Sequence, residues 1–250
     1  MREGTWEVLP FDAGTFTFPE DEHWPGEEGV VVAHALRNRA GVVFLFDTGI
    51  AAGDAELDAR YHPIERPLSE ALAALGLGIP DVRAATNCHL HADHAGQNHR
   101  LPGIPIYVRA AERAAALGRD YTVDAWVNAP GLRYEVVDGD VEVQPGITLV
   151  PTPGHTPGHQ SAVVETRRGP VVLAGQAIYS REEWLDRPGR EGRSSAVDRV
   201  AYDRSVTRLR GFAPVEVRFA HDRASWQRHE RGPTAGLPGE PAPLPTSQSG

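Results

Sequence analysis

The sequence contains no lysine and a single cysteine, and each shortage excludes a kind of chemistry. All 25 basic residues are arginine, so no lysine is present to form a Schiff base or to act as a general base. The only thiol, Cys88, excludes a disulfide within the chain, which predicts a reducing compartment. We interpret Cys88 as a small buried apolar residue, and we expect its side chain to face away from that of His89.

Long hydrophobic runs and an excess of positive charge are also missing. The first residues lack the apolar core of a signal peptide, and apolar runs such as 42–46 are far too short to span a bilayer. The chain has 34 acidic and 25 basic residues, a net charge of -9, which argues against nucleic-acid and anionic-membrane partners. We therefore predict a soluble, cytoplasmic protein.

The composition changes near the C-terminus. From residue 232 onward proline, glycine and serine dominate without an apolar period, so we predict a disordered tail over residues 232–250. We expect the remaining residues, 1–231, to form one domain.

Predicted strands and helices alternate along this domain. Apolar and β-branched runs predict strands at 30–36, 42–46, 82–86, 105–108, 134–137, 141–143, 147–150, 161–165, 171–173 and 215–219. Helical spacing or alanine enrichment predicts helices at 67–77, 109–117 and 198–210. Residues 50–66 look irregular and are expected to form a loop over the site. The pattern is typical of an α/β or α+β protein with helices packed outside its sheets.

One stretch, residues 87–96, reads Asn-Cys-His-Leu-His-Ala-Asp-His-Ala-Gly. Three imidazoles and a carboxylate fall within six positions, and these donors suit zinc and its first-row neighbours. In an extended segment His89, His91 and Asp93 would point the same way, and a turn would bring His94 to join them. A polar loop that happens to be rich in histidine is the alternative, but this spacing argues against it.

Other polar residues also follow predicted strands, so strand ends at a common edge would gather them. They are Asp47, His155, Gln176 and His221. Asp47 is either a turn residue or a carboxylate that orients a metal-binding histidine.

Together these motifs resemble the metallo-β-lactamase superfamily over most of residues 30–225. The motifs are His89-x-His91-x-Asp93-His94, Thr152-Pro-Gly-His155 and His221. The run 152–161 and Tyr179 are more similar to the quorum-quenching N-acyl-homoserine-lactone lactonases than to the β-lactamases or glyoxalase II enzymes. The resemblance implies an α+β fold, an αββα sandwich of two mixed sheets with helices on the outer faces and a dinuclear metal site at the sheet edges.

The resemblance also assigns metal ligands. His89, His91 and His155 would hold one ion, and Asp93, His94 and His221 would hold the second. The aspartate that bridges both ions in the family corresponds to Gln176, whose amide offers an oxygen but no negative charge. We therefore expect one tightly bound zinc ion and a second that is weak or absent, with iron or manganese as alternative metals.

The implied activity is that of a metal-dependent hydrolase, which opens a lactone or ester by attack of a metal-bound hydroxide. Tyr179 would donate a hydrogen bond to the developing oxyanion, or else is a core aromatic. Asp93 would pass a proton to the leaving alkoxide. We expect His159 to be structural or to support the ligands. Trp126 and Trp184 either wall an acyl pocket or pack in the core.

Two further classes share these motifs. A mononuclear iron oxygenase of the persulfide dioxygenase type carries the same histidine pattern. A non-hydrolytic member that binds a metal or a ligand would explain the missing bridging carboxylate, although the intact Asp93, His94 and Tyr179 argue against it. The sequence leaves the oligomeric state open.

Overall fold

The structure is a computed structural model that describes residues 4–189 and 192–222. Its strands are β1 (Glu7–Thr17), β2 (Glu28–Arg37), β3 (Val43–Phe46), β4 (Val82–Thr86), β5 (Pro105–Arg109), β6 (Arg133–Val137), β7 (Val141–Gln144), β8 (Ile147–Pro151), β9 (Gln160–Thr166), β10 (Gly169–Leu173) and β11 (Glu216–Arg218). Its helices are α1 (Ala55–Tyr61), α2 (Leu68–Ala74), α3 (Ala92–Ala95), α4 (Ala110–Ala115), α5 (Asp124–Val127), α6 (Arg181–Trp184) and α7 (Arg199–Gly211).

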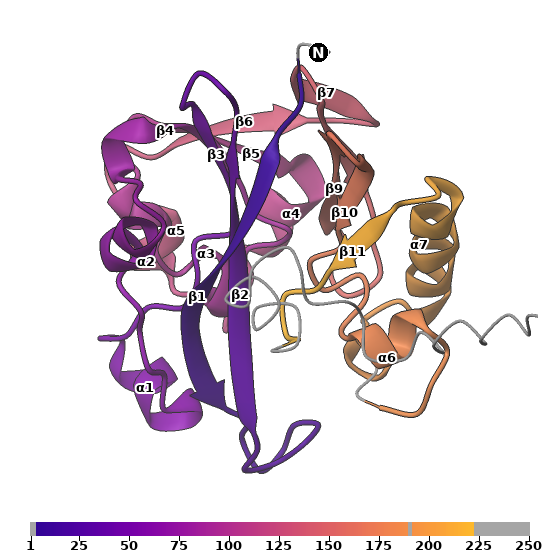
Figure 1. Ribbon diagram of the computed structural model, residues 1–250. Helices are drawn as coiled ribbons and strands as arrows, with labels where there is room; N and C mark the ends of the chain where they lie inside the picture. The colour runs from indigo at the N-terminus through magenta and orange to yellow at the C-terminus, as the bar shows by residue number, and fades with distance from the viewer. Residues whose placement is uncertain (1–3, 190–191, 223–250) are drawn as a thin grey trace, which may run out of the picture.

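The strands form two mixed sheets that pack against each other (Figure 1), with a shared apolar cluster between them. The first sheet has the order β1-β2-β3-β4-β5-β6, and the second has the order β11-β10-β9-β8-β7. In the first sheet β1, β2 and β3 pair antiparallel, whereas β3 to β6 pair parallel. In the second sheet only β10 and β11 pair parallel. Parallel strands end at the same edge of a sheet, so the loops that follow β3, β4 and β5 emerge together.

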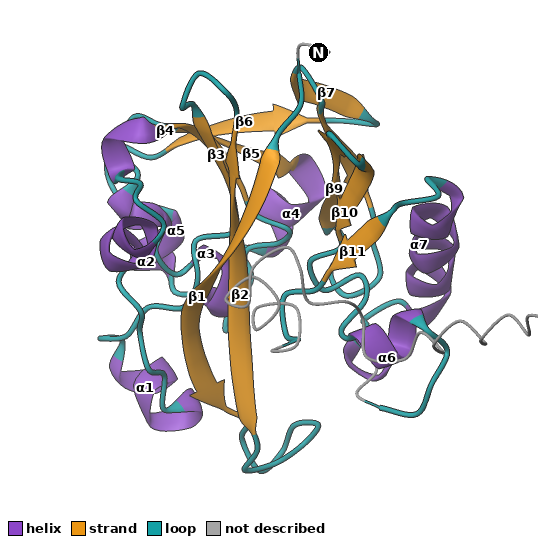
Figure 2. Ribbon diagram, in the orientation of Figure 1, coloured by secondary structure: helices purple, strands orange, loops and turns teal. Residues whose placement is uncertain are grey.

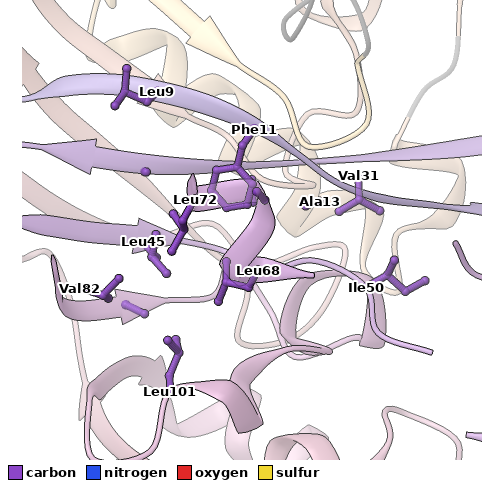
Figure 3. Close-up of a cluster of buried hydrophobic side chains, with 14 of the residues drawn as sticks. Leu9, Phe11, Ala13, Val31, Leu45, Ile50, Leu68, Leu72, Val82 and Leu101 are labelled. Atoms are coloured by element: carbon purple, nitrogen blue, oxygen red, sulfur yellow. The ribbon is translucent and has the colours of Figure 1, made fainter. Parts of the chain in front are cut away.

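Helices cover the outer face of each sheet (Figure 2). On the first sheet α2 buries Leu68 and Leu72 against a cluster that includes Leu9, Phe11 and Leu45 (Figure 3). On the second sheet α7 buries Leu209 in a cluster whose strand residues are Val150, Val163, Val172 and Val217. Each helix therefore shields an apolar sheet face from water, which is the main stabilising contribution of such packing.

Alternation along the strands supplies the core between the two sheets. In β3, Val43 and Leu45 face the helix side, while Phe44 and Phe46 belong to the inner cluster. The second sheet contributes the other half of this inner cluster, with Ile147, Leu149, Ala162, Val164, Val171 and Leu173. The predicted αββα sandwich with two mixed sheets is therefore confirmed, because successive side chains of one strand serve two apolar layers.

Two elements differ from the sequence prediction. Residues 50–66 were expected to be a loop, but α1 forms there because Asp54 caps it by accepting a hydrogen bond from the Leu57 backbone N–H. No strand was predicted over 7–17, yet β1 is an edge strand of eleven residues that pairs with β2. Its register shifts between Asp12 and Thr15, and this break in the pairing interrupts a regular alternation.

In the described part of the chain no helix is long and apolar enough to cross a membrane. The predicted tail, 232–250, lies outside the described residues. The domain limit at residue 231 and the cytoplasmic location stay predictions.

Candidate metal centre

The loop after β4 carries the first histidines, and two anchors hold its start. The Cys88 N–H donates to Asp47 Oδ1 at 2.7 Å, and the Gln160 N–H donates to the Cys88 carbonyl at 2.8 Å, which ties the loop to both sheets. Beyond this anchor His89 and His91 turn toward each other, with His89 Nε2 2.9 Å from His91 Nδ1. Two ring nitrogens therefore converge on one point.

The expected extended segment does not form, because β4 ends at Thr86 and residues 88, 89 and 91 lie in bends. His91 is the N-cap of α3, so Asp93 is not a member of an extended row but lies in this four-residue helix with His94. The end of the helix packs closely against the loop after β3. At Gly96 a Cβ would lie 2.4 Å from the Ala92 carbonyl oxygen and 2.6 Å from the Ala51 nitrogen. Only glycine fits there, and the helix then aims Asp93 and His94 at a second point.

His155 comes from the second sheet, in the loop after β8. This loop packs on α7 through Gly154, which has a φ of 144° and whose Cβ would lie 2.5 Å from the Tyr202 Cα. The ring of His155 lies 4.7 Å from that of His89 and 5.2 Å from that of His91, measured between centroids. We call His89, His91 and His155 the first cluster. Three possible ligand atoms of this cluster lie within 4.8 Å of one another.

The second cluster consists of Asp93, His94 and His221. Asp93 Oδ2 lies 3.2 Å from His94 Nε2 and 3.5 Å from His221 Nε2. His221 follows β11, and its Nδ1 donates to the Val30 carbonyl at 2.8 Å, which leaves Nε2 directed at Asp93. Gln176 lies beside this cluster, with its Oε1 3.2 Å from His94 Nε2 and 9% of its surface exposed.

Asp47 fits both interpretations that its sequence position allowed. It has the turn-like φ of 66°, and its buried carboxylate accepts a hydrogen bond from His94 Nδ1 at 3.0 Å. This bond fixes the ring so that Nε2 faces Asp93 and Gln176.

Burial keeps the first cluster neutral. Desolvation lowers the pKa of His89, His91 and His155, and the positive charge of His94 lowers the pKa of His89 and His155 further. Neutral imidazole is the form that binds a metal, so these three side chains are in the right state without losing protons.

The second cluster carries charge instead. Burial alone would lower the pKa of His94, but Asp93, Cys88 and Asp47 outweigh it and raise that pKa well above its ordinary value. Burial would likewise raise the pKa of Asp93, yet the charge and hydrogen bond of His94 hold it low. Burial and the charge of His94 lower the pKa of His221 to about 4. Without a metal, this cluster is an ion pair of His94 with its carboxylates.

Ring nitrogens without partners show that the first cluster fits a metal ion. His155 is only 6% exposed, and neither of its ring nitrogens has a hydrogen-bond partner within the described part of the chain. Buried polar atoms of this kind call for a partner. A divalent ion bound by His89, His91 and His155 would provide it, since three histidines with one open position suit a catalytic zinc site.

Aromatic side chains border the second cluster. The Tyr179 ring stacks on His221 with centroids 4.7 Å apart, and its other neighbour, Trp24, lies 4.9 Å away. Sequence reasoning missed Trp24, because it stands in the β1–β2 connection far from every motif. Trp184 is partly buried and packs against the apolar cluster that contains Leu209 of α7.

Two further side chains, Cys88 and His159, lie beside His89. Cys88 is buried as expected, but its Sγ does not face away from His89: it lies 3.1 Å from His89 Nδ1 and 3.3 Å from His94 Nδ1. The reason is that residues 88 and 89 lie in bends, so their side chains do not alternate as they would in a strand. His159 has a supporting position, because its Nε2 accepts the Gln176 backbone N–H at 3.0 Å and its Nδ1 lies 2.9 Å from Thr152 Oγ1.

The architecture and the histidine clusters define a class: a two-sheet sandwich with a metal-binding centre at the strand ends. Within this class the chain belongs to the metallo-β-lactamase superfamily, whose model matches residues 26–230. The predicted membership is therefore confirmed.

Curated relatives that match this chain include several N-acyl homoserine lactonases. One from a Bacillus species is 42% identical over 115 residues, which is 45% of this chain and 45% of that protein, so the match spans about half of the relative. AttM from Azorhizobium caulinodans is 31% identical over 191 residues, 69% of this chain and 72% of the relative. A solved structure of a variant of Bacillus thuringiensis AiiA, with N-decanoyl-L-homoserine at its active site, is 25% identical with a TM-score of 0.74; the match covers 93% of this chain and 98% of that one.

Proposed function

We propose that this protein is a metal-dependent hydrolase that opens a lactone or ester ring in a small molecule of the N-acyl homoserine lactone type. One observation carries the proposal: His89 and His91 from the first sheet meet His155 from the second, and neither ring nitrogen of His155 has a hydrogen-bond partner within the described residues. The lactonase names of the relatives and the N-acyl homoserine bound to a similar structure support the choice of substrate.

The first cluster would hold the tightly bound ion, which we propose to be zinc, with iron or manganese as alternatives. Such an ion lowers the pKa of a coordinated water toward neutrality and polarises a carbonyl. Asp93, His94 and His221 would hold a second ion more weakly. Gln176 stands where the resemblance places a bridging aspartate, and its neutral amide leaves two nearby dications with one negative charge fewer.

Two side chains of the second cluster region would act on the substrate. The Asp93 carboxylate, whose Oδ2 lies 3.2 Å from His94 Nε2 and 3.5 Å from His221 Nε2, would pass a proton to the leaving alkoxide, as the resemblance implies. Tyr179 would donate its hydroxyl hydrogen bond to the carbonyl or ester oxygen of the substrate. Its backbone is held for this task, since the Tyr179 N–H donates to Glu183 Oε2 at 2.6 Å.

The proposal is tested with a panel of N-acyl homoserine lactones and aryl esters, with ring opening followed by proton release. We expect turnover by protein loaded with zinc and none above background after chelation. Tyr179→Phe should lower kcat by about 100-fold, the scale of losing one oxyanion donor, without changing metal content. A zinc-loaded protein that opens none of these substrates would contradict the proposed activity.

Metal counting tests the uneven pair of sites. After dialysis against a mild chelator we expect one equivalent of metal to remain, measured by elemental analysis. Two retained equivalents would show that Gln176 or another group compensates for the missing charge. Iron in the protein as isolated, together with oxygen uptake on a persulfide substrate, would favour the oxygenase alternative.

A further inference from the structure

A buried carboxylate outside both clusters connects the loops that carry the first cluster. Glu112 lies on α4, a helix that supplies no metal ligand, and only 1% of it is exposed. Burying a carboxylate costs free energy unless hydrogen bonds compensate it. Its surroundings therefore show what this side chain is for.

Three donors from three separate segments converge on Glu112. The Leu90 backbone N–H donates to Oε1 at 2.8 Å, the Thr156 hydroxyl donates to Oε2 at 2.7 Å, and the Tyr121 hydroxyl makes a short hydrogen bond to Oε1. A carboxylate is the side chain best matched to them, because it offers two accepting oxygens and no competing proton.

Each donor sits next to a ligand of the first cluster. Leu90 lies between His89 and His91, and Thr156 directly follows His155. Tyr121 packs its ring against His91, with centroids 4.5 Å apart. One carboxylate thus contacts the immediate neighbours of all three histidines, including the one that comes from the other sheet.

The close approach that this arrangement requires is visible at Gly158. A Cβ at this position would lie 2.1 Å from the Glu112 backbone nitrogen. Only glycine lets the loop that follows His155 lie directly against the start of α4. The second glycine of the Pro-Gly-His-Thr-Pro-Gly run therefore has a physical purpose, which is to bring Thr156 within reach of Glu112.

We propose that Glu112 is a positioning residue that sets the separation of His155 from His89 and His91, and so determines the metal affinity of the first cluster. This inference rests on the proposed function in that it takes the first cluster to be a metal site. The carboxylate acts through hydrogen bonds to the two loops and through the Tyr121 ring, and it touches neither metal nor substrate.

The test compares Glu112→Ala with Glu112→Gln and with Glu135→Ala, which removes an exposed carboxylate paired with Arg133 on β6. Zinc affinity is measured by competition with a chelating dye, and the cobalt-loaded proteins give absorption spectra that report ligand geometry. We expect Glu112→Ala to bind zinc about 10–100-fold more weakly, the range for losing a group that orients metal ligands, and to change the cobalt spectrum. The Glu135→Ala protein should match the wild type.

The conservative variant separates positioning from general stability. Glutamine keeps one accepting oxygen for Leu90 and Tyr121, and the Thr156 hydroxyl can turn to accept from the amide. We therefore expect Glu112→Gln to recover most of the affinity and the wild-type spectrum. A folded Glu112→Ala protein with wild-type zinc affinity and cobalt spectrum would overturn the proposal.

If the Glu112→Ala protein does not fold, a second pair of variants tests the same proposal. Tyr121→Phe and Thr156→Val each remove one hydroxyl donor and leave the carboxylate in place. We expect each to weaken zinc binding and the double variant to weaken it more; wild-type affinity in all three would overturn the proposal. Because these measurements record binding, a wild-type protein that holds zinc but opens no lactone would refute the proposed activity and leave the role of Glu112 standing.

Discussion

The two clusters of the metal centre lie side by side but are held in different electrostatic states. Burial lowers the pKa values of the first cluster, so its three histidines are neutral. In the second cluster the pKa of His94 is raised and that of Asp93 is lowered, so the two form an ion pair. Neither ring nitrogen of His155 has a hydrogen-bond partner within the described residues, whereas each ring nitrogen of His94 contacts a carboxylate and Nε2 of His221 lacks a hydrogen bond.

This difference has a consequence for metal binding. An ion that enters the first cluster displaces no proton, but an ion that binds His94 Nε2 must displace one and must also separate that nitrogen from Asp93 and Gln176. The neutral amide of Gln176 and the bound proton act in the same direction. Both predict that the second cluster holds its metal more weakly.

The largest effect is expected from removing the first cluster's link to the second sheet. His155→Ala leaves His89 and His91 with one ligand fewer, so we expect lactone opening to fall by more than about 100-fold, beyond the range for groups that only orient ligands. Zinc content should fall below one equivalent. His62→Asn, at an exposed position that ends α1, is the control. Full activity in His155→Ala would place the essential metal in the second cluster.

A smaller effect is expected from placing a carboxylate beside the second cluster. Gln176→Asp adds a negative charge close to His94, so we expect the second zinc ion to bind about 10–100-fold more tightly and lactone opening to be kept or increased. Gln176→Asn, which shortens the amide without adding charge, is the matched control. Stepwise zinc titration gives both affinities. A large loss of turnover in Gln176→Asp would mean that the amide has a catalytic task of its own.

The smallest effect is the pH dependence of stability in the metal-free protein. Burial lowers the pKa of His159 to about 3 and that of His221 to about 4, from an ordinary value of 6.5. Below pH 6.5 these two histidines are protonated in the unfolded chain but stay neutral in the folded protein. Their contribution is therefore complete above pH 6.5 and is lost as the pH falls toward 4.

His94 should act in the opposite sense. Its folded pKa is raised, so its contribution is complete below its unfolded pKa and is lost as the pH rises through the folded value. Urea unfolding in the presence of chelator, from pH 8 to pH 4, measures both effects. His159→Gln should reduce the loss of unfolding free energy between pH 6.5 and pH 4 by the contribution of one histidine. A free energy of unfolding that stays constant between pH 6.5 and 4 would show that these histidines are not held neutral.

Regular elements were predictable wherever the local pattern was strong. β4 covers 82–86 as expected, and the helix expected over 198–210 is α7, with Asp198 as its cap. α1 escaped because its seven residues include no buried side chain, so no apolar period marks it. The extended row of ligands was wrong at Asp93, since the packing at Gly96 that allows α3 involves a loop distant in sequence.

The order of residues was enough to predict the superfamily and the types and spacing of the candidate ligands, because imidazoles and carboxylates at fixed short intervals are chemically specific. It also showed the amide at position 176. Which nitrogen each histidine presents depends on the fold, since Asp47 and the Val30 carbonyl reach His94 and His221 from remote strands. It alone also revealed Trp24, Tyr121 and Glu112 around the centre. Hydrogen bonds and burial between distant segments leave no local pattern, so these roles could not be read along the chain.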